Sequence, residues 1–357
     1  MKVAIIGGGV MGLATGWALR RRGHEPVVYE QFEVGNPHGS SHGRSRIFRL
    51  AYAEDHYVQL AQEALRLWRE LEAESGETIL ELYGLVEMVQ TLEESTARTL
   101  ERNGVAWERL DRDEAMRRYP INVAEGSFAV VQNEAGIARA DKALEAFRRE
   151  LDVREHTKAH PAEVDADAVV VTAGSWVNEL LDEPLPVKTT RETLCYFRPE
   201  GGRPVPSVVS FQPDRHTHDM YSLYDPVYGL KVGAHHAGQD ADPNVPGEPE
   251  PELIDRITAW TNETYRLVDP APVEAQTCMY TTTADESFIL ERRDRLVVGS
   301  PCSGHGFKFC PVIGEIAADL ILQSRTRHPI GLFGIRRIID PSQVVSAGPG
   351  LAKPKAH

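Results

Sequence analysis

The chain has 357 residues, a formal net charge of -14 and a hydrophobic fraction of 41%, a length that predicts roughly two domains with sizeable cores. Its acidity argues against nucleic acids and anionic membranes as partners, because both select a basic surface. The four cysteines form no CxxC pair, no metal-ligand spacing occurs, and no stretch has the length of a membrane span, so we expect a cytoplasmic protein without a metal.

The first thirty residues predict a strand, a tight turn, a helix and a second strand. An apolar run at 3–6 leads into Gly7, Gly9 and Gly12, which form the pattern G-x-G-x-x-G. The first glycine permits the turn, the second lets a phosphate approach the backbone, and the third lets the helix pack against the strand. Glu30 ends the second strand about 20 residues downstream, where its carboxylate can accept hydrogen bonds from ribose hydroxyls.

Together these features predict a dinucleotide site at the start of the chain. The free N–H groups of the helix N-terminus and the positive end of its dipole suit a pyrophosphate. The pattern does not separate FAD from NAD, and the alternative is a glycine-rich turn in an unrelated α/β protein. A signal peptide is not expected, because Arg20, Arg21 and Arg22 follow the apolar run instead of preceding it.

The middle of the chain alternates predicted helices and strands. Residues 57–76 carry apolar side chains at helical spacing and end at a glycine, which indicates an amphipathic helix. Residues 82–89 predict a strand. A short helix follows Asp111, the expected N-cap, with Glu114 completing a capping box. Asp141 opens a further helix.

A second unit of strand, glycine turn and helix begins with the buried strand expected at 168–171. Two such units far apart predict a Rossmann-like, doubly wound α/β sheet assembled from separated segments. Residues 190–276 alternate aromatic and β-branched residues with Pro and Gly, which indicates a second, mostly antiparallel β-sheet domain for the substrate. We expect the cofactor domain at 1–80, 136–185 and 275–345, the substrate domain at 81–135 and 186–274, and a frayed tail at 346–357.

Four stretches together resemble one family of flavoproteins. They are the N-terminal glycine pattern, "SSHGRSRIFRLAYAEDHY", "CMYTTTADESFIL" and "SGHGFKFCPVIGEIAADL". In residues, order and spacing they are similar to the monomeric sarcosine oxidase family, which includes N-methyltryptophan oxidase and pipecolate oxidase. The resemblance covers nearly the whole chain, and it implies FAD in the dinucleotide site.

The resemblance implies that Cys278, in "CMYT", carries the FAD as an 8α-S-cysteinyl thioether. By residue type alone, a cysteine is more often a small buried hydrophobe. The helix expected from about Pro311 would direct its N-terminus toward the pyrimidine edge of the flavin. Further cofactor contacts implied by the resemblance are Ser45, Arg46, Gly174, Trp176, Gly304, Gly306 and Lys308.

Two cations are the expected anchor for the substrate. The resemblance assigns the substrate carboxylate to Arg49 and Lys308, with Glu54 holding the arginine when substrate is absent. Arginine grips a carboxylate bidentately and lysine adds a point charge. Arg46 would lie near the flavin ring, one turn from Arg49 if this stretch is helical. The alternative is a basic patch paired with acidic groups, which we prefer for Arg44.

The stretch "GLKVGAHHAGQ" supplies Lys231 and His235, which strand alternation places on one face. The resemblance assigns Lys231 to the reaction of the reduced flavin with oxygen and His235 to the substrate pocket, with His236 as the competing alignment. Tyr280 and Tyr221 match pocket tyrosines. The loop that contains Tyr221 is slightly shorter than the usual substrate loop of the family, so the substrate's identity stays open.

The reaction implied is oxidation of a secondary amino acid by a monomeric enzyme. Hydride passes from the C–N bond of sarcosine, a larger N-methyl amino acid, proline or pipecolate to flavin N5, an imine forms, and O2 becomes H2O2. Three alternatives stay open. They are a flavin dehydrogenase or biosynthetic oxidase with another acceptor or a bulkier substrate, a nicotinamide-dependent dehydrogenase, and a flavin-binding subunit of a multi-chain oxidase.

Overall fold

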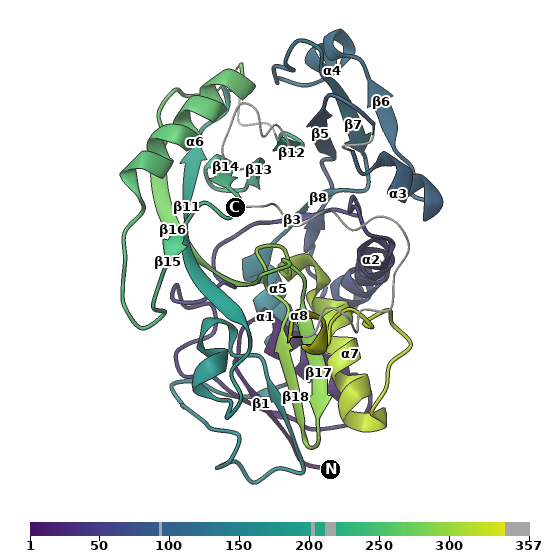
Figure 1. The fold of residues 1–357 in the computed structure, drawn as a ribbon, viewed down its shortest axis with the longest axis vertical. Helices are drawn as coiled ribbons and strands as arrows, with labels where there is room; N and C mark the ends of the chain where they lie inside the picture. The colour runs from purple at the N-terminus through teal and green to yellow at the C-terminus, as the bar shows by residue number, and fades with distance from the viewer. Residues whose placement is uncertain (93–94, 201–203, 211–218, 267, 340–357) are drawn as a thin grey trace.

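A computed structural model describes residues 1–92, 95–200, 204–210, 219–266 and 268–339. The tail expected at 346–357 lies outside these residues. Within them the strands form three sheets, of six, nine and three strands. In Figure 1 the six-stranded sheet and its helices occupy the lower half of the molecule, and the nine-stranded sheet occupies the upper half.

The six-stranded sheet has the order β17-β18-β10-β1-β2-β9. Its neighbours are parallel except β17 and β18, which are antiparallel. Every residue of β1 and β10 is buried, as in parallel sheets covered by helices on both faces. The strands are β1 (Val3–Ile6), β2 (Val27–Tyr29), β9 (Asp152–Arg154), β10 (Ala168–Val171), β17 (Ile289–Arg293) and β18 (Leu296–Ser300).

Four helices pack together beside this sheet: α1 (Val10–Arg21), α2 (Asp55–Ser75), α5 (Ala140–Arg148) and α7 (Cys310–Gln323). The contact between α1 and α7 is close because α7 carries Gly314, where a Cβ would lie 2.4 Å from the carbonyl oxygen of Ala14. Helix α2 buries the predicted apolar stripe, which includes Leu60 and Trp68, and it ends at Gly76 in the left-handed conformation.

The nine-stranded sheet is antiparallel except where β5 meets β12. Its longest pairing joins β11 (Val187–Phe197) to β16 (Glu274–Thr283), and α6 (Pro251–Thr264) packs on β11 and β14 with Ile257 and Trp260 buried. The remaining strands are β5 (Leu85–Val89), β6 (Glu108–Leu110), β7 (Phe128–Gln132), β12 (Ser207–Ser210), β13 (Met220–Asp225), β14 (Gly229–Ala234) and β15 (Gln239–Asp240).

The three-stranded sheet has the order β3-β8-β4. It consists of β3 (Arg46–Phe48), β8 (Gly136–Ala138) and β4 (Leu80–Glu81). Because β3 is extended, the stretch from Arg46 to Arg49 is not the helical turn considered from the sequence. The short helices are α3 (Ala97–Arg102), α4 (Arg112–Arg118), η1 (Gly174–Glu179), η3 (Phe307–Phe309) and α8 (Arg336–Ile339).

The fold class predicted from the sequence is confirmed, and so is the N-cap of α4, where the Asp111 carboxylate accepts from the Glu114 N–H at 2.8 Å. Two local predictions differ. Helix α5 begins before Asp141, which lies in its first turn and pairs with Arg139, and the helix after β10 is a 3-10 helix. The third segment predicted for the cofactor domain, 275–345, includes most of β16. That strand pairs with β11 and so belongs to the nine-stranded sheet. The division into domains remains a proposal.

No helix in the described ranges is long and apolar enough to cross a membrane.

Candidate active site

The turn after β1 has the tight geometry expected of a phosphate-binding turn. Gly7 has φ of +106°, a conformation that side chains disfavour. A Cβ at Gly12 would lie 1.9 Å from the carbonyl oxygen of Gly7, so only glycine lets α1 start this close to the strand. At Gly9 a Cβ would come within 3.1 Å of the Ser41 hydroxyl, which itself accepts from the Val10 N–H. The first turn of α1 therefore presents backbone to the space in front of it.

Glu30 follows β2 directly, at the position where a ribose-binding acid is expected. Its side chain is 7% exposed. One carboxylate oxygen accepts from the Gly8 N–H at 2.8 Å and the other from the Phe32 N–H at 2.9 Å. These bonds fix the carboxylate beside the glycine turn and leave acceptor capacity on both oxygens.

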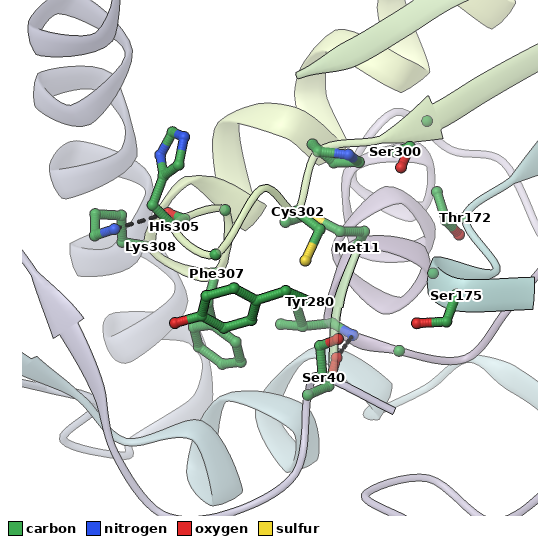
Figure 2. Close-up of a pocket in the computed structure, with 18 of the residues that line it drawn as sticks. Met11, Ser40, Thr172, Ser175, Tyr280, Ser300, Cys302, His305, Phe307 and Lys308 are labelled. Carbon is green, nitrogen blue, oxygen red and sulfur yellow. Dashed lines mark hydrogen bonds between the residues drawn. The ribbon is translucent and has the colours of Figure 1, made fainter. Parts of the chain in front are cut away.

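One large cavity, of about 2590 Å³, connects this turn to the space under the nine-stranded sheet. At one end it is lined by Glu30, Trp176 and the glycine turn, and at the other by Arg49 and Lys308. Figure 2 shows Thr172 and Ser175 on one side of it, Lys308 and His305 on the other, and Tyr280 and Cys302 between them. Its volume, the glycine turn and the buried acid fit an FAD.

Cys278 lies near the middle of β16, where it pairs with Glu192 of β11. Its side chain lines the cavity and is 7% exposed. The thiol forms no disulfide, and the same is true of the other three cysteines. A second thiol in the cavity, Cys302, accepts a hydrogen bond from the Thr281 N–H at 3.4 Å, and burial raises its pKa.

Arg46 ties together the loop that precedes β3. Its guanidinium donates to the carbonyl oxygens of Ser40 at 2.8 Å, His42 at 2.6 Å and Ser45 at 2.9 Å, and its carbon lies 5.5 Å from the centre of the Phe307 ring. Both Arg46 and Ser45 line the cavity. The positive charge therefore faces the cofactor space, while its hydrogen bonds keep the loop in place.

Arg49 and Lys308 meet around Tyr52. The Lys308 ammonium donates to the Tyr52 hydroxyl at 2.9 Å and to the His305 carbonyl at 2.7 Å. The Arg49 guanidinium donates to the Ala51 carbonyl at 2.8 Å, and its carbon lies 4.4 Å from the centre of the Tyr52 ring. Burial first and then Arg49 lower the pKa of Lys308 well below its usual range.

Within the described ranges, no carboxylate lies within 4.0 Å of the charged nitrogens of Arg49 or Lys308. The expected contact between Arg49 and Glu54 is therefore not formed as an ion pair. Glu54 lines the cavity at the start of α2, and burial raises its pKa. A buried lysine and a half-buried arginine with no carboxylate in contact among the described residues form a site for an anion.

Lys231 lies at the junction of β14 with the loop before β3. It is 4% exposed, and its ammonium donates to the Ser45 carbonyl at 3.3 Å. Burial and then the charge of Arg46 lower its pKa to about 7. Because this is near neutral, the protonation state of Lys231 responds to small changes in its surroundings.

His235 follows β14 directly and contacts the pocket tyrosines. Its ring lies 5.7 Å from that of Tyr280 and 6.3 Å from that of Tyr221, measured between centres. Burial, His236 and the nearby cations hold its pKa well below the usual range, which favours the neutral imidazole. His236 faces Glu286 instead, at 3.8 Å. One possible metal-ligand atom from each of His235, His236 and Glu286 lies within 4.8 Å of the other two. That distance would suit a shared metal, which the sequence did not predict.

The glycines of "SGHGFKF" are required by close packing. At Gly304, with φ of +72°, a Cβ would lie 2.5 Å from the Tyr280 ring and 2.7 Å from the His235 ring. At Gly306 it would lie 1.7 Å from the carbonyl oxygen of Pro301. This turn therefore brings Lys308 and α7 directly under the tyrosines, and α7 begins at Cys310, close to the predicted start.

The remaining predicted residues also line the cavity. Gly174, with φ of +54°, opens η1, and Trp176 of η1 donates its indole N–H to Asn244 and meets Phe32 edge to face at 5.6 Å. Tyr221, on β13, is half-buried and packs against Gly233, whose Cβ would lie 2.6 Å from the hydroxyl. The cavity thus brings together the residues proposed from the sequence except Gly12, which packs behind the turn against Gly7, and their individual roles remain proposals.

Two residues that contact the cations were not identified from the sequence. Tyr52 lies three residues after Arg49, and His305 lies three residues before Lys308, both inside the stretches that carry the family resemblance. Spacing within those stretches could have drawn attention to them. Their side chains have no chemistry that distinguishes them from other buried aromatic residues.

Comparisons with known proteins cover nearly the whole chain. Residues 2–320 match the family model described as FAD dependent oxidoreductase. Human "Peroxisomal sarcosine oxidase" is 32% identical over 93% of this chain and 95% of its own length. "Monomeric sarcosine oxidase" of Streptomyces avermitilis is also 32% identical, over 94% of this chain and 97% of its own.

Solved structures give a similar result. The open form of NikD, described as an unusual amino acid oxidase essential for nikkomycin biosynthesis, superposes with a TM-score of 0.81 at 25% identity, over 93% of this chain and 96% of its own. L-proline dehydrogenase from P. horikoshii superposes with a TM-score of 0.78 at 20% identity, over 94% and 97% of the two chains, and so shares the fold.

Proposed function

Because the chain belongs to the FAD-dependent oxidoreductase family, and within it is a relative of the sarcosine oxidases, we propose that it oxidises the C–N bond of a secondary amino acid with O2 as the acceptor. The observation that carries the proposal is a pair of cations, the half-buried Arg49 and the buried Lys308, at the end of a cavity that fits FAD. That pair selects a carboxylate within reach of the flavin.

Bound FAD would accept a hydride from the substrate and pass two electrons to O2, which leaves as H2O2. In this proposal Gly7, Gly9 and Gly12 hold its pyrophosphate and Glu30 its ribose. Cys278 would form a thioether to its 8α-methyl group. Arg46 would lie beside the ring. Further contacts would come from Ser45, Gly174, Trp176, Gly304 and Gly306.

Arg49 and Lys308 would orient the substrate by its carboxylate. A planar guanidinium and an ammonium approaching from different sides fix both the position and the rotation of that group. The adjacent C–N bond is then held in one place relative to the flavin, and this restriction of motion contributes to the rate. Tyr280, Tyr221 and His235 would form the opposite wall.

The amine of the substrate has to be neutral to lose a hydride, because a protonated nitrogen cannot stabilise the forming imine. We assign no general base to the chain. His235 is a poor candidate, because burial and the neighbouring cations hold its pKa well below the usual range and so oppose its taking up a proton. The rate should therefore rise with pH toward the pKa of the bound amine.

Lys231 would act in the second half of the reaction. Electron transfer to O2 develops negative charge on oxygen, and a nearby ammonium stabilises that charge. The proposal rests on the burial of Lys231 against Ser45, inside the cavity and beside Arg46. The lysine has to be protonated for this role.

The function is tested with purified holoenzyme and a panel of amines. We expect H2O2 from sarcosine, N-methylalanine, L-proline or L-pipecolate. We expect none from glycine, which lacks the secondary amine, and none from sarcosinamide, which lacks the carboxylate. Flavin reduction without air but slow reoxidation in air would favour a dehydrogenase. A yellow protein that no member of the panel reduces would contradict the proposal and favour a bulkier substrate or a subunit of a larger oxidase.

The remaining properties are also proposals. A small-molecule substrate and a monomeric protein fit the name of the Streptomyces relative, "Monomeric sarcosine oxidase". Location in the cytoplasm stays a prediction, and it differs from the word "Peroxisomal" in the name of the human relative. The compartment is tested by fractionating cells and assaying the flavoprotein in each fraction.

A further inference from the structure

A buried carboxylate near the flavin space has no role in the reaction described above. Asp225 is 1% exposed and is the last residue of β13. One of its oxygens accepts from the N–H groups of Val227 at 2.9 Å and Tyr228 at 3.0 Å. These bonds close the turn that leads into β14, the strand that carries Lys231.

The other oxygen of Asp225 reaches across to the loop before β3. It accepts from the Ser45 hydroxyl at 3.2 Å, in a fully buried contact. The carbonyl of the same Ser45 accepts from the ammonium of Lys231 and from the guanidinium of Arg46. A single carboxylate therefore links the β13–β14 turn to the residue on which both cations converge.

We infer that Asp225 is a positioning residue for Lys231: it anchors Ser45, whose carbonyl holds the ammonium, and its negative charge favours the protonated lysine. The inference rests on the proposed role of Lys231 in the reaction with O2. It adds a residue that the resemblance to the family did not single out.

The charges around Lys231 support this inference. Burial and Arg46 lower the pKa of the lysine, whereas Cys278 and Asp225 raise it. A thioether at Cys278 cannot ionise. Once the flavin is attached, Asp225 would therefore be the remaining one of these two groups that counters the effect of Arg46 on the pKa of Lys231. The groups that face Lys231 from the surrounding elements are Arg46, His42, Cys278, Asp225 and the Tyr196 ring, whose centre is 6.0 Å from the ammonium.

A purely structural role is the competing explanation, because an aspartate that accepts from N–H groups two and three residues ahead is common in turns. Asparagine can make the same turn bonds, since its amide oxygen accepts equally well. Asp225→Asn therefore removes the charge while it keeps the turn. Ser45→Ala removes the hydrogen bond between Asp225 and the loop before β3 and keeps the charge.

The experiment compares the pH dependence of reoxidation by O2 in wild-type and Asp225→Asn holoenzyme, by stopped flow. In wild type, reoxidation should slow as pH rises and Lys231 loses its proton. In Asp225→Asn we expect the midpoint of this decline to lie roughly one pH unit lower, because the loss of a neighbouring negative charge produces a shift of that size. A second readout needs no turnover: the absorption spectrum of the oxidised holoenzyme, titrated with pH, should show the same displacement. An unchanged midpoint in both readouts would overturn the inference.

Lys231→Met separates this inference from the proposed function. If Lys231→Met reoxidises as fast as wild type, the role of the lysine fails and the inference fails with it. If Lys231→Met is slow and Asp225→Asn keeps the wild-type midpoint, only the inference fails. Should Asp225→Asn not fold or not bind FAD, Ser45→Ala decides: a midpoint displaced in the same direction supports the inference, and an unchanged midpoint overturns it.

Discussion

The ammonium of Lys308 and the hydroxyl of Tyr52 lie 2.9 Å apart, in a buried hydrogen bond between two segments far apart in the sequence. The ring of the same tyrosine lies under the guanidinium of Arg49. One phenol thus contacts both cations of the proposed carboxylate site. It holds them close together without neutralising them, since the phenol stays uncharged: burial raises its pKa to about 12.

Replacing Tyr52 by Phe should weaken the carboxylate site without unfolding the protein. The ring still packs under Arg49, but Lys308 loses one hydrogen bond, which contributes about 1 kcal/mol. We expect the Kd of acetate to rise about fivefold, measured from the change in flavin absorption. Tyr57→Phe is the matched control, because the Tyr57 ring lies 5.3 Å from that of Tyr52 but its hydroxyl meets Ser287. Equal effects of the two variants would show that Tyr52 acts only by packing.

Replacing Arg49 by Gln should impair binding of every carboxylate ligand. A hydrogen bond between charged groups contributes about 1.5–3 kcal/mol, so Kd should rise by roughly 10- to 150-fold. Acetate binding and KM for the best amino acid of the panel are the measurements. Arg102→Gln is the control, because Arg102 also lines the mouth of the cavity but is largely exposed and pairs with Asp55. A small effect at Arg49 together with a large one at Arg102 would place the anion site elsewhere.

Replacing Cys278 by Ala should release the flavin from the denatured protein. In the wild type, acid precipitation should leave the yellow colour in the pellet, because a thioether survives denaturation. In Cys278→Ala the colour should appear in the supernatant. Cys302→Ala is the matched control, since this second thiol lines the same cavity and its loss should leave the pellet yellow. Wild-type flavin in the supernatant would disprove the attachment while leaving FAD binding intact.

Two glycines of α1 should respond differently to alanine. At Gly12 the new Cβ would lie 1.9 Å from a backbone oxygen, whereas at Gly16 it would meet only the Leu151 side chain, at 2.8 Å, which can move. We expect Gly12→Ala to lose FAD and to unfold at a markedly lower temperature. Gly16→Ala should change the free energy of unfolding by less than about 1 kcal/mol, because helix propensity offsets the contact. Thermal unfolding and flavin content check both, and equal losses would contradict the assignment of the glycine turn.

Lys231 should make the flavin-free protein more stable as pH rises. Its pKa is about 7 in the folded chain, below the ordinary value of 10.5. Between those two values the unfolded chain binds more protons than the folded one, so the free energy of unfolding rises with pH, by at most about 1.4 kcal/mol per unit. Below the folded pKa both states are protonated and the dependence ends.

Urea unfolding across that pH window measures this effect. Protein in a Cys278→Ala background, stripped of flavin, avoids interference from the cofactor. Lys231→Met should flatten the rise, whereas Lys188→Met should not, because Lys188 is an exposed residue paired with Asp240. Parallel pH dependences in wild type and Lys231→Met would mean that the buried lysine titrates normally.

The sequence predicted the cofactor half of the fold well because its signals are local. A buried strand, a glycine turn and a helix follow one another within Val3–Arg21, and each constrains the next. The register of strands far apart could not be read in this way. That β16 pairs with β11 depends on side chains packing across a sheet, and no local pattern specifies the partner.

The proposed site shows the same division. Arg49, Lys308 and Cys278 carry charge or reactivity and stand in recognisable stretches, so the sequence identified them. Asp225 stands in the turn whose sequence departs from the family, and its contact with Ser45 spans 180 residues. Contacts of that kind arise only from the folded arrangement, so positioning residues are harder to predict than the groups that they position.

The parallel pairing of β1 with β10 has a consequence for synthesis of the protein. The strand that leads into the glycine turn leaves the ribosome first. One of its neighbours, β2, follows shortly afterwards, but the other, β10, begins 165 residues later. At translation rates of about 5–20 residues per second, the side of β1 that pairs with β10 stays open for roughly 8–30 s. The next strand beyond β10, β18, comes later still. The nascent chain therefore carries an apolar strand with one open edge until β10 is made, and the sheet is complete only after the ribosome has passed β18.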